Sequence, residues 1–153
     1  MRAYASDPDA SARLLGELGF SPAAGGWLLA GERRRARWSY DEPPQALGLQ
    51  GAGSIHHVAW SAADDGELAH LRAIAAATGA RPTPVIDRQY FHSVYFREPS
   101  GVLFELATRD VGFTVDEPLE SLGHGLMLPP RYEARRALLE PRLTPITNPR
   151  SPA

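Results

Sequence analysis

The sequence predicts an α+β fold made of two βαβββ modules, and an internal repeat is the first observation behind this prediction. RAYASDPDASARLL (2–15) and VAWSAADDGELAHL (58–71) each give a strand, a small polar turn and a helix, with a glycine after the helix. The second observation is the period-two alternation of Phe91–Arg97, which is typical of a strand. Because duplicated modules usually pack together, we expect two curved sheets around a shared cavity.

The composition describes an ordinary globular domain. The chain has 153 residues, of which 43% are hydrophobic and 22% charged, and its net charge of −2 gives no reason to expect nucleic acid or an anionic membrane as a partner. The absence of cysteine excludes disulfides and thiolate metal sites. No apolar run reaches the roughly 20 residues of a membrane span, and the start lacks the layout of a signal peptide, so we expect a cytoplasmic protein.

The first module, residues 1–50, begins with a strand and a capped helix. Asp7 suits the N-cap and Pro8 the first helical position, and Gly19 suits the C-terminal cap. The predicted strands are Arg2–Ser6, Trp27–Ala30, Arg34–Tyr40 and Ala46–Leu49.

The second module, residues 51–109, repeats this order. A helix capped by Asp64 or Asp65 ends at Thr78, and Glu98–Gly101 predicts a tight hairpin turn because proline and glycine suit its backbone. The predicted strands are Ser54–Ala62, Pro84–Asp87, Phe91–Arg97 and Val102–Thr108.

Residues 110–153 form a C-terminal extension whose residue pattern differs from that of the two modules. This segment is rich in proline and shows no strand pattern, and it predicts one short helix at about Arg131–Leu139. We expect it to wrap over the domain or to meet a neighbouring molecule. The last residues, Thr147–Ala153, are expected to be disordered.

Two stretches carry the chemistry, GAGSIHHVAW (51–60) and GVLFELAT (101–108). Neighbouring side chains of a strand point to opposite faces, so only one of His56 and His57 is expected to face a given partner. Glu105 stands in an apolar strand, where a carboxylate is costly to bury unless a cation pairs with it. Two interpretations remain: a histidine and Glu105 share a divalent metal, or they form a buried ion pair.

With these residues on the page, the chain resembles the vicinal oxygen chelate superfamily of glyoxalases, bleomycin resistance proteins and extradiol dioxygenases. The resemblance runs from about Gly51 to Leu143 through GAGSIHHVAW, PVIDRQYFHSVYFREPSGVLFELAT and VGFTVDEPLESLG…LMLPP. Within the superfamily it is to the C-terminal half of ring-cleaving dioxygenases of the hydroquinone dioxygenase type. It implies a glyoxalase/dioxygenase-type curved-sheet domain with a tail that carries a short helix.

The resemblance also implies roles for five residues. His57 and Glu105 match metal ligands, and His56, Arg88 and Tyr95 match groups that orient the substrate and move protons. The expected metal is Fe(II), with Mn(II) as the alternative, held by two histidines and a carboxylate that leave positions open for the substrate and O2. A salt bridge would equally explain Arg88, and a satisfied core hydroxyl would explain Tyr95.

A third ligand is missing from this set. The relatives are about twice as long, and their remaining histidine comes from their first module, whereas here Met1 aligns with His57 and Arg2–Tyr4 contains no histidine. We therefore treat the first strand as truncated, and His124 is the only spare donor. A homo-oligomer, a partner chain or an upstream part of a longer gene would supply the ligand, or the oxygenase activity has been lost.

The expected function is that of a ring-cleaving, extradiol-type dioxygenase domain that uses Fe(II) and O2 on hydroquinone- or catechol-like aromatics. The alternative is a non-catalytic or degenerate module of the same fold that binds a small aromatic compound. A metal-dependent isomerase or lyase ranks third, because the first module offers no acid–histidine pair. Of the remaining histidines, we expect His70 to face solvent and His92 to bind no metal. Trp27, Trp38 and Trp60 are expected in the core or at an interface.

Overall fold

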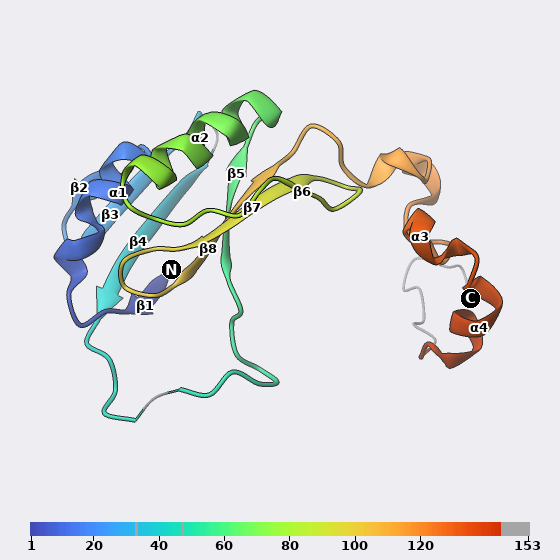
Figure 1. Cartoon of the computed structure of the whole chain (residues 1–153), viewed down its shortest axis with the longest axis horizontal. Helices are drawn as coiled ribbons and strands as arrows, with labels where there is room; N and C mark the ends of the chain where they lie inside the picture. Colours follow the sequence, from blue (N-terminus) through green and yellow to red (C-terminus); the bar gives the residue numbers. More distant parts are fainter. Residues whose placement is uncertain (33, 47, 145–153) are drawn as a thin grey trace.

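The computed structural model describes residues 1–32, 34–46 and 48–144, and it confirms an α+β fold of two βαβββ modules (Figure 1). The first module contains β1 (Arg2–Tyr4), η1 (Pro8–Ser11), α1 (Ala12–Glu17), β2 (Ser21–Ala23), β3 (Gly26–Ala30) and β4 (Arg35–Asp41). The second contains β5 (Val58–Ala62), α2 (Asp65–Ala77), β6 (Ile86–Asp87), β7 (His92–Arg97) and β8 (Leu103–Thr108).

The two sheets have the same topology. Their strand orders are β1-β4-β3-β2 and β5-β8-β7-β6. The pairs β1–β4 and β5–β8 are parallel, and the other neighbouring pairs are antiparallel. The registers also correspond, because Ala3 lies opposite Tyr40 and Ala59 lies opposite Glu105. The internal repeat of the sequence is therefore a structural repeat.

The predicted helix caps are confirmed. Asp7 accepts a hydrogen bond from the Ala10 amide, and Asp64 accepts one from the Glu67 amide at 2.9 Å. Gly79 follows α2 with a φ of +95°, a conformation that favours glycine after a helix. One detail differs: the turn after Asp7 is a 3₁₀ helix, so α1 begins only at Ala12.

Three strand predictions need correction. No strand forms at Ala46, Gly48 or Leu49, and Leu49 is almost fully exposed, so nothing there pairs with it; Leu47 lies outside the described residues. The short strand β2 was not predicted; it contains Pro22, which is tolerated because β2 lies at the edge of its sheet. The strand predicted from Ser54 starts at Val58, because residues 51–54 close a turn.

A cluster of aromatic side chains joins the two modules. Trp38 of β4 lies edge-on to Phe104 of β8, with ring centroids 5.3 Å apart, and Trp60 of β5 lies edge-on to Phe20 at 4.9 Å. Each such pair adds about 0.5–1.5 kcal/mol beyond area burial. The prediction of buried tryptophans is confirmed for Trp38 and Trp60.

A buried carboxylate ties the second module to the first. Glu98, in the predicted β7–β8 turn, is 2% exposed and accepts hydrogen bonds from the hydroxyls of Ser11 and Tyr40, both of the first module. Its other oxygen accepts from the Val102 amide at 3.1 Å. The tight turn itself is confirmed by the bond from the Gly101 amide to the Glu98 carbonyl.

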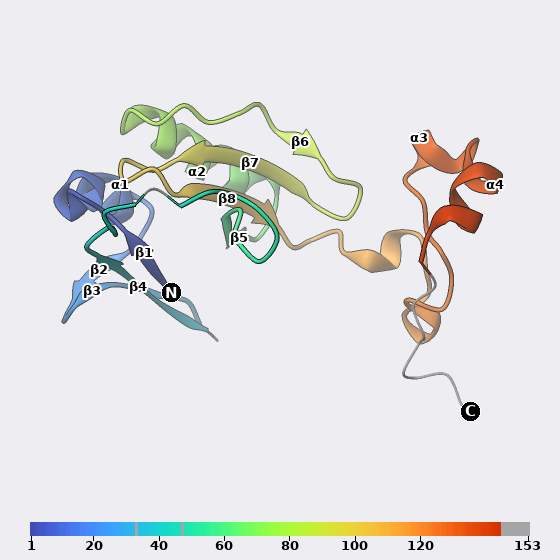
Figure 2. The same ribbon diagram turned by 90° about the horizontal axis from the view of Figure 1, so that it is seen from below.

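The C-terminal extension projects away from the sheets in both views (Figures 1 and 2) and does not wrap over the domain as one alternative had predicted. It contains η2 (Phe113–Val115), η3 (Leu119–Ser121), α3 (Pro130–Glu133), α4 (Arg136–Leu139) and η4 (Glu140–Arg142). The single predicted helix is thus two short ones, broken at Arg135. The stretch Thr147–Ala153 lies outside the described residues.

None of the helices in the described ranges is long and apolar enough to cross a bilayer.

The Glu98 contacts predict a large loss of stability when this carboxylate is removed. Glu98→Ala leaves two hydroxyls and one amide without their acceptor, so we expect the free energy of unfolding to fall by about 3 kcal/mol. Urea denaturation measures the change. Glu120→Ala, at an exposed acid, is the control and should cost under about 0.5 kcal/mol. Equal losses in the two variants would contradict the role assigned to Glu98.

Candidate metal and substrate site

Glu105 is the centre of the candidate site, and the alternation of β8 decides where it points. Phe104 and Leu106 are buried in the hydrophobic core, so Glu105 faces the opposite side of the sheet. The residue is nevertheless only 3% exposed. Tyr95 lies directly opposite it on β7 and covers it from that side.

Both oxygens of this carboxylate have partners. His57 Nε2 lies 2.9 Å from Glu105 Oε2, and the Tyr95 hydroxyl donates a hydrogen bond to Oε1. These contacts join three of the five residues named from the sequence, and the other two, His56 and Arg88, lie beside His57 and Tyr95. The His57–Glu105 contact joins the two groups that both interpretations had paired.

The two histidines lie side by side, so the premise that they point to opposite faces is wrong, although His57 is the one of the two that contacts Glu105 in the described structure. Their Nδ1 atoms are 2.9 Å apart, and their rings are perpendicular with centroids 5.2 Å apart. The physical reason is that both precede β5, which begins at Val58, so strand alternation does not apply to them. His56 is exposed, and His57 is partly buried.

An open hollow of about 380 Å³ lies over these groups. Four of its lining residues were predicted from the sequence: His56, His57, Arg88 and Tyr95. The other two, Thr83 and Leu103, were missed. All six belong to the second module, so the hollow differs from the expected cavity between two sheets. No sequence pattern pointed to Thr83. Its hydroxyl accepts a hydrogen bond from the Tyr95 amide.

Arg88 contacts the site through the face of an aromatic ring. Its guanidinium carbon lies 5.4 Å from the centroid of the Tyr95 ring, within the range of a cation–π interaction. The alternative of an Asp87–Arg88 salt bridge is not found in the described part of the chain. Asp87 instead accepts the Gln89 amide hydrogen at 2.7 Å.

The environment keeps Tyr95 protonated. Burial raises the pKa of its hydroxyl, and the hydrogen bond to Glu105 raises that pKa further, whereas Ser93 and Arg88 act in the opposite direction. A neutral hydroxyl is a hydrogen-bond donor. Tyr95 can therefore donate to Glu105 or to an oxygen atom placed in the hollow.

The donor atoms fit a shared divalent metal. Two ligand atoms about 2.1 Å from one ion, at right angles to each other, are roughly 3 Å apart, and His57 Nε2 and Glu105 Oε2 are 2.9 Å apart. Across residues 1–32, 34–46 and 48–144, no group of three histidine or acidic side chains could hold a metal. His124 does not join the pair, because its segment projects away from the sheets (Figure 2).

The remaining histidines lie elsewhere. His70 is exposed on α2, as predicted. His92 is not part of the site: its Nδ1 lies 2.6 Å from Asp65 at the start of α2, and its Nε2 lies 4.0 Å from Asp87. The hydrogen bond to Asp65 raises the pKa of His92, and burial opposes it.

The sequence is similar to proteins described as ring-cleaving dioxygenases. It is 48% identical to MhqA of Bacillus subtilis over 63% of this chain and 31% of that protein, and 45% identical to MhqO of the same organism over 67% and 33%. It is 41% identical to a chlorohydroquinone/hydroquinone 1,2-dioxygenase of Sphingobium indicum over 61% of this chain and 29% of that protein. The matched part thus covers about a third of each relative. No protein-family model matches the chain.

Solved structures agree with the fold. A crystal structure of a dioxygenase from Bacillus subtilis superposes with a TM-score of 0.82 at 35% identity, over 95% of this chain and 49% of that one. A glyoxylase/bleomycin resistance protein/dioxygenase domain from Frankia superposes with a TM-score of 0.53 over 71% of this chain, and at 15% identity this shows the fold alone. The present chain therefore spans about half of the solved dioxygenase.

The His92–Asp65 pair predicts a pH-dependent contribution to stability. Because the pKa of folded His92 is raised above its unfolded value near 6.5, the contribution is complete below about pH 6.5 and is lost as the pH rises through the folded pKa. NMR titration of the His92 ring measures this pKa. Asp65→Asn should lower it, whereas Asp9→Asn, at an exposed acid, should leave it unchanged. A His92 pKa that ignores Asp65→Asn would contradict the assignment.

Proposed function

We propose that the chain belongs to the vicinal oxygen chelate superfamily and that it is the metal-binding part of a ring-cleaving dioxygenase, a proposal that its similarity to the dioxygenases of Bacillus subtilis supports. The proposed substrates are O2 and a small aromatic compound of the hydroquinone or catechol kind. The relative from Sphingobium indicum, whose name includes hydroquinone 1,2-dioxygenase, supports this substrate class. The chain covers only part of that protein, so the activity of the whole remains our proposal.

The observation that carries the proposal is the placement of two ligand atoms under an open hollow. His57 Nε2 and Glu105 Oε2 are 2.9 Å apart, and Tyr95 holds the other oxygen of the carboxylate. The proposed metal is Fe(II), with Mn(II) as the alternative. Such an ion would supply open coordination positions at which an aromatic hydroxyl and O2 become neighbours.

The other lining residues would then act on the substrate. Arg88 brings a fixed positive charge to the hollow, which suits a phenolate oxygen. Tyr95 holds a proton that it can donate to a substrate oxygen. His56, with its Nδ1 2.9 Å from that of His57, orients the proposed ligand ring and can pass a proton to or from solvent.

The proposed site needs one more protein ligand. We propose that a histidine of a second polypeptide segment supplies it, either from another copy of this chain or from a partner. The hollow is open on its outer side, where such a residue could enter. Non-haem iron sites with two histidines and one carboxylate have this composition.

Metal binding is the experiment that tests the proposal. Anaerobic titration of the full chain with Fe(II) should show saturable binding, and Glu105→Ala should weaken it by about tenfold or more, because a ligand matters at least as much as an outer-shell group. Glu120→Ala, an acid on the extension, is the control and should leave binding unchanged. A stoichiometry below one metal per chain would indicate a site shared between chains.

Failure of this experiment would favour the second candidate, a module that binds a small aromatic compound without metal. The specific observation behind that candidate is that His57 Nε2 and Glu105 Oε2 lie within hydrogen-bond distance of each other, at 2.9 Å. Wild type and Glu105→Ala would then bind Fe(II) equally weakly. O2 uptake with a hydroquinone panel, measured for the metal-loaded chain, separates the two functions further.

A further inference from the structure

The turn that carries Arg88 is fastened to the start of the C-terminal extension. Residues 88–91 join β6 to β7, and the Arg88 amide donates a hydrogen bond to the Phe91 carbonyl at 2.9 Å, which closes the turn. The tip of this hairpin lies beside the start of the extension (Figure 1), where the Gly112 amide donates to the Tyr90 carbonyl at 2.8 Å. Two segments that β7 and β8 separate along the chain therefore meet at this turn.

The backbone of the turn is held in a strained conformation. Gln89, which directly follows Arg88, has a φ of +69°, and it is the one non-glycine residue with a positive φ in the described ranges. A residue with a Cβ rarely adopts this region, and such strain persists only where surrounding contacts enforce it, often at functional sites. The contacts that hold Gln89 therefore also fix the direction in which the Arg88 side chain leaves the turn.

Asp116 of the extension holds the strained turn from outside. Its Oδ2 accepts a hydrogen bond from the Gln89 side-chain Nε2 at 2.7 Å and another from the Tyr90 hydroxyl at 3.0 Å. Within the turn, the Gln89 amide donates to Asp87 Oδ1 at 2.7 Å. Hydrogen bonds to an ionised carboxylate are stronger than those between neutral groups, so Asp116 is well suited to keep the turn in place.

The side chains around Asp116 show that its role is local. The rings of Tyr90 and Phe113 have centroids 4.8 Å apart, and burial and the Asp116 carboxylate raise the pKa of the Tyr90 hydroxyl, which therefore remains a donor. Phe113 is 65% exposed and Asp116 is exposed, so neither belongs to the hydrophobic core. Replacing an exposed residue seldom unfolds a protein, so a variant of Asp116 reports on the turn.

Arg88 brings a positive charge to the hollow that the turn borders. Its guanidinium carbon lies 5.4 Å from the centroid of the Tyr95 ring, and within the described part of the chain it forms no salt bridge. A guanidinium without an anionic partner suits a phenolate oxygen. Its attraction for that oxygen depends on where it stands, so a displaced turn weakens the binding of the anion.

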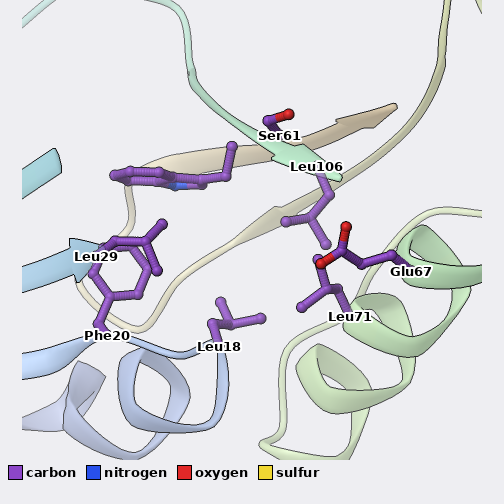
Figure 3. A pocket seen from close by; sticks show the side chains of 8 residues that line it. Leu18, Phe20, Leu29, Ser61, Glu67, Leu71 and Leu106 are labelled. Carbon is purple, nitrogen blue, oxygen red and sulfur yellow. The ribbon is translucent and has the colours of Figure 1, made fainter. Parts of the chain in front are cut away.

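A second hollow shows what an apolar space of this molecule lacks. It lies in a notch between the two modules, where leucine and aromatic side chains, among them Phe20 and Leu71, form the walls (Figure 3). Among the described residues that line it, Glu67 is the one that carries a charge, and an acid repels a phenolate. The cation of Arg88 thus decides which of these two hollows accepts such an anion.

From these contacts we infer that Asp116 is a positioning residue for Arg88. By holding Gln89 and Tyr90, it fixes the turn so that the guanidinium stands over the Tyr95 ring, where it meets the phenolate oxygen of an aromatic ligand. The extension thereby sets how tightly the hollow binds the anion. The inference deepens the proposed function and rests on it for the class of ligand, whereas the position of Arg88 does not depend on a metal.

The test titrates the ¹⁵N-labelled, metal-free full chain with pentafluorophenolate, a phenol that is ionised at neutral pH. The ¹⁹F signals of the ligand give its affinity, and the side-chain Nε–Hε signal of Arg88, which Arg88→Lys assigns, gives the place of the guanidinium. We expect saturable binding with a Kd on the order of 1 mM, as befits so small a ligand. Asp116→Ala should weaken it about fivefold, because the turn loses the acceptor of two hydrogen bonds.

Matched variants separate the contact from the charge. Asp116→Asn keeps an oxygen that can accept both hydrogen bonds, so it should bind within twofold of the wild type. Glu120→Ala removes an exposed acid of the same extension and should also bind like the wild type. Without ligand, the Arg88 signal should move in Asp116→Ala and return in Asp116→Asn, while the three indole signals of the tryptophans stay in place.

Three results would overturn the inference: an Arg88 signal that does not move in Asp116→Ala, wild-type affinity in that variant, or Asp116→Asn binding as weakly as Asp116→Ala. Pentafluoroanisole carries no charge, and its binding as tightly as the phenolate would equally overturn the inference. Absence of Fe(II) binding would contradict the proposed function and leave these comparisons unchanged.

Discussion

The burial of the Glu105 carboxylate is the constraint on which the site depends. Glu105 is a residue that is only 3% exposed within an apolar strand, and its carboxylate is stable there only when both oxygens are engaged, since an unpaired buried carboxylate costs several kcal/mol. The register of β7 places Tyr95 opposite it, and the chain ahead of β5 places His57 beside it. The same requirement that makes the pair stable leaves the two candidate metal-ligand atoms, His57 Nε2 and Glu105 Oε2, 2.9 Å apart.

The two modules show how one topology serves two roles. Tyr40 occupies the register position in the first module that Glu105 occupies in the second, and Met1 stands ahead of β1 as His57 stands ahead of β5. Tyr40 uses its hydroxyl to bind Glu98, which anchors the β7–β8 turn. The first module therefore lacks the acid–histidine pair and instead supports the hairpin that carries Tyr95 and Glu105.

Sequence reasoning succeeded where the determinants are local. Asp64, Gly79 and the Glu98–Gly101 turn are set by a few neighbouring residues, and all were predicted correctly. It failed where partners are remote: the Ser11–Glu98 bond joins residues 87 apart, and nothing near Glu98 distinguishes it from an exposed turn residue. The placement of His56 beside His57 depended on where β5 starts, and strand ends are poorly determined by alternation.

The alternation of side chains along β8 places the candidate site on one face of the strand and the hydrophobic core on the other. Odd-numbered Glu105 contacts His57 and Tyr95 on one face, whereas even-numbered Phe104 and Leu106 pack in the hydrophobic core on the other. Because the two faces share one backbone, a change in the packing of Phe104 or Leu106 in the core would shift Glu105 even though neither side chain contacts its carboxylate. A packed core transmits such displacements, since it has few voids to absorb them. The inter-module contacts of Trp38, Trp60 and Glu98 are thus also the support of the candidate metal ligands.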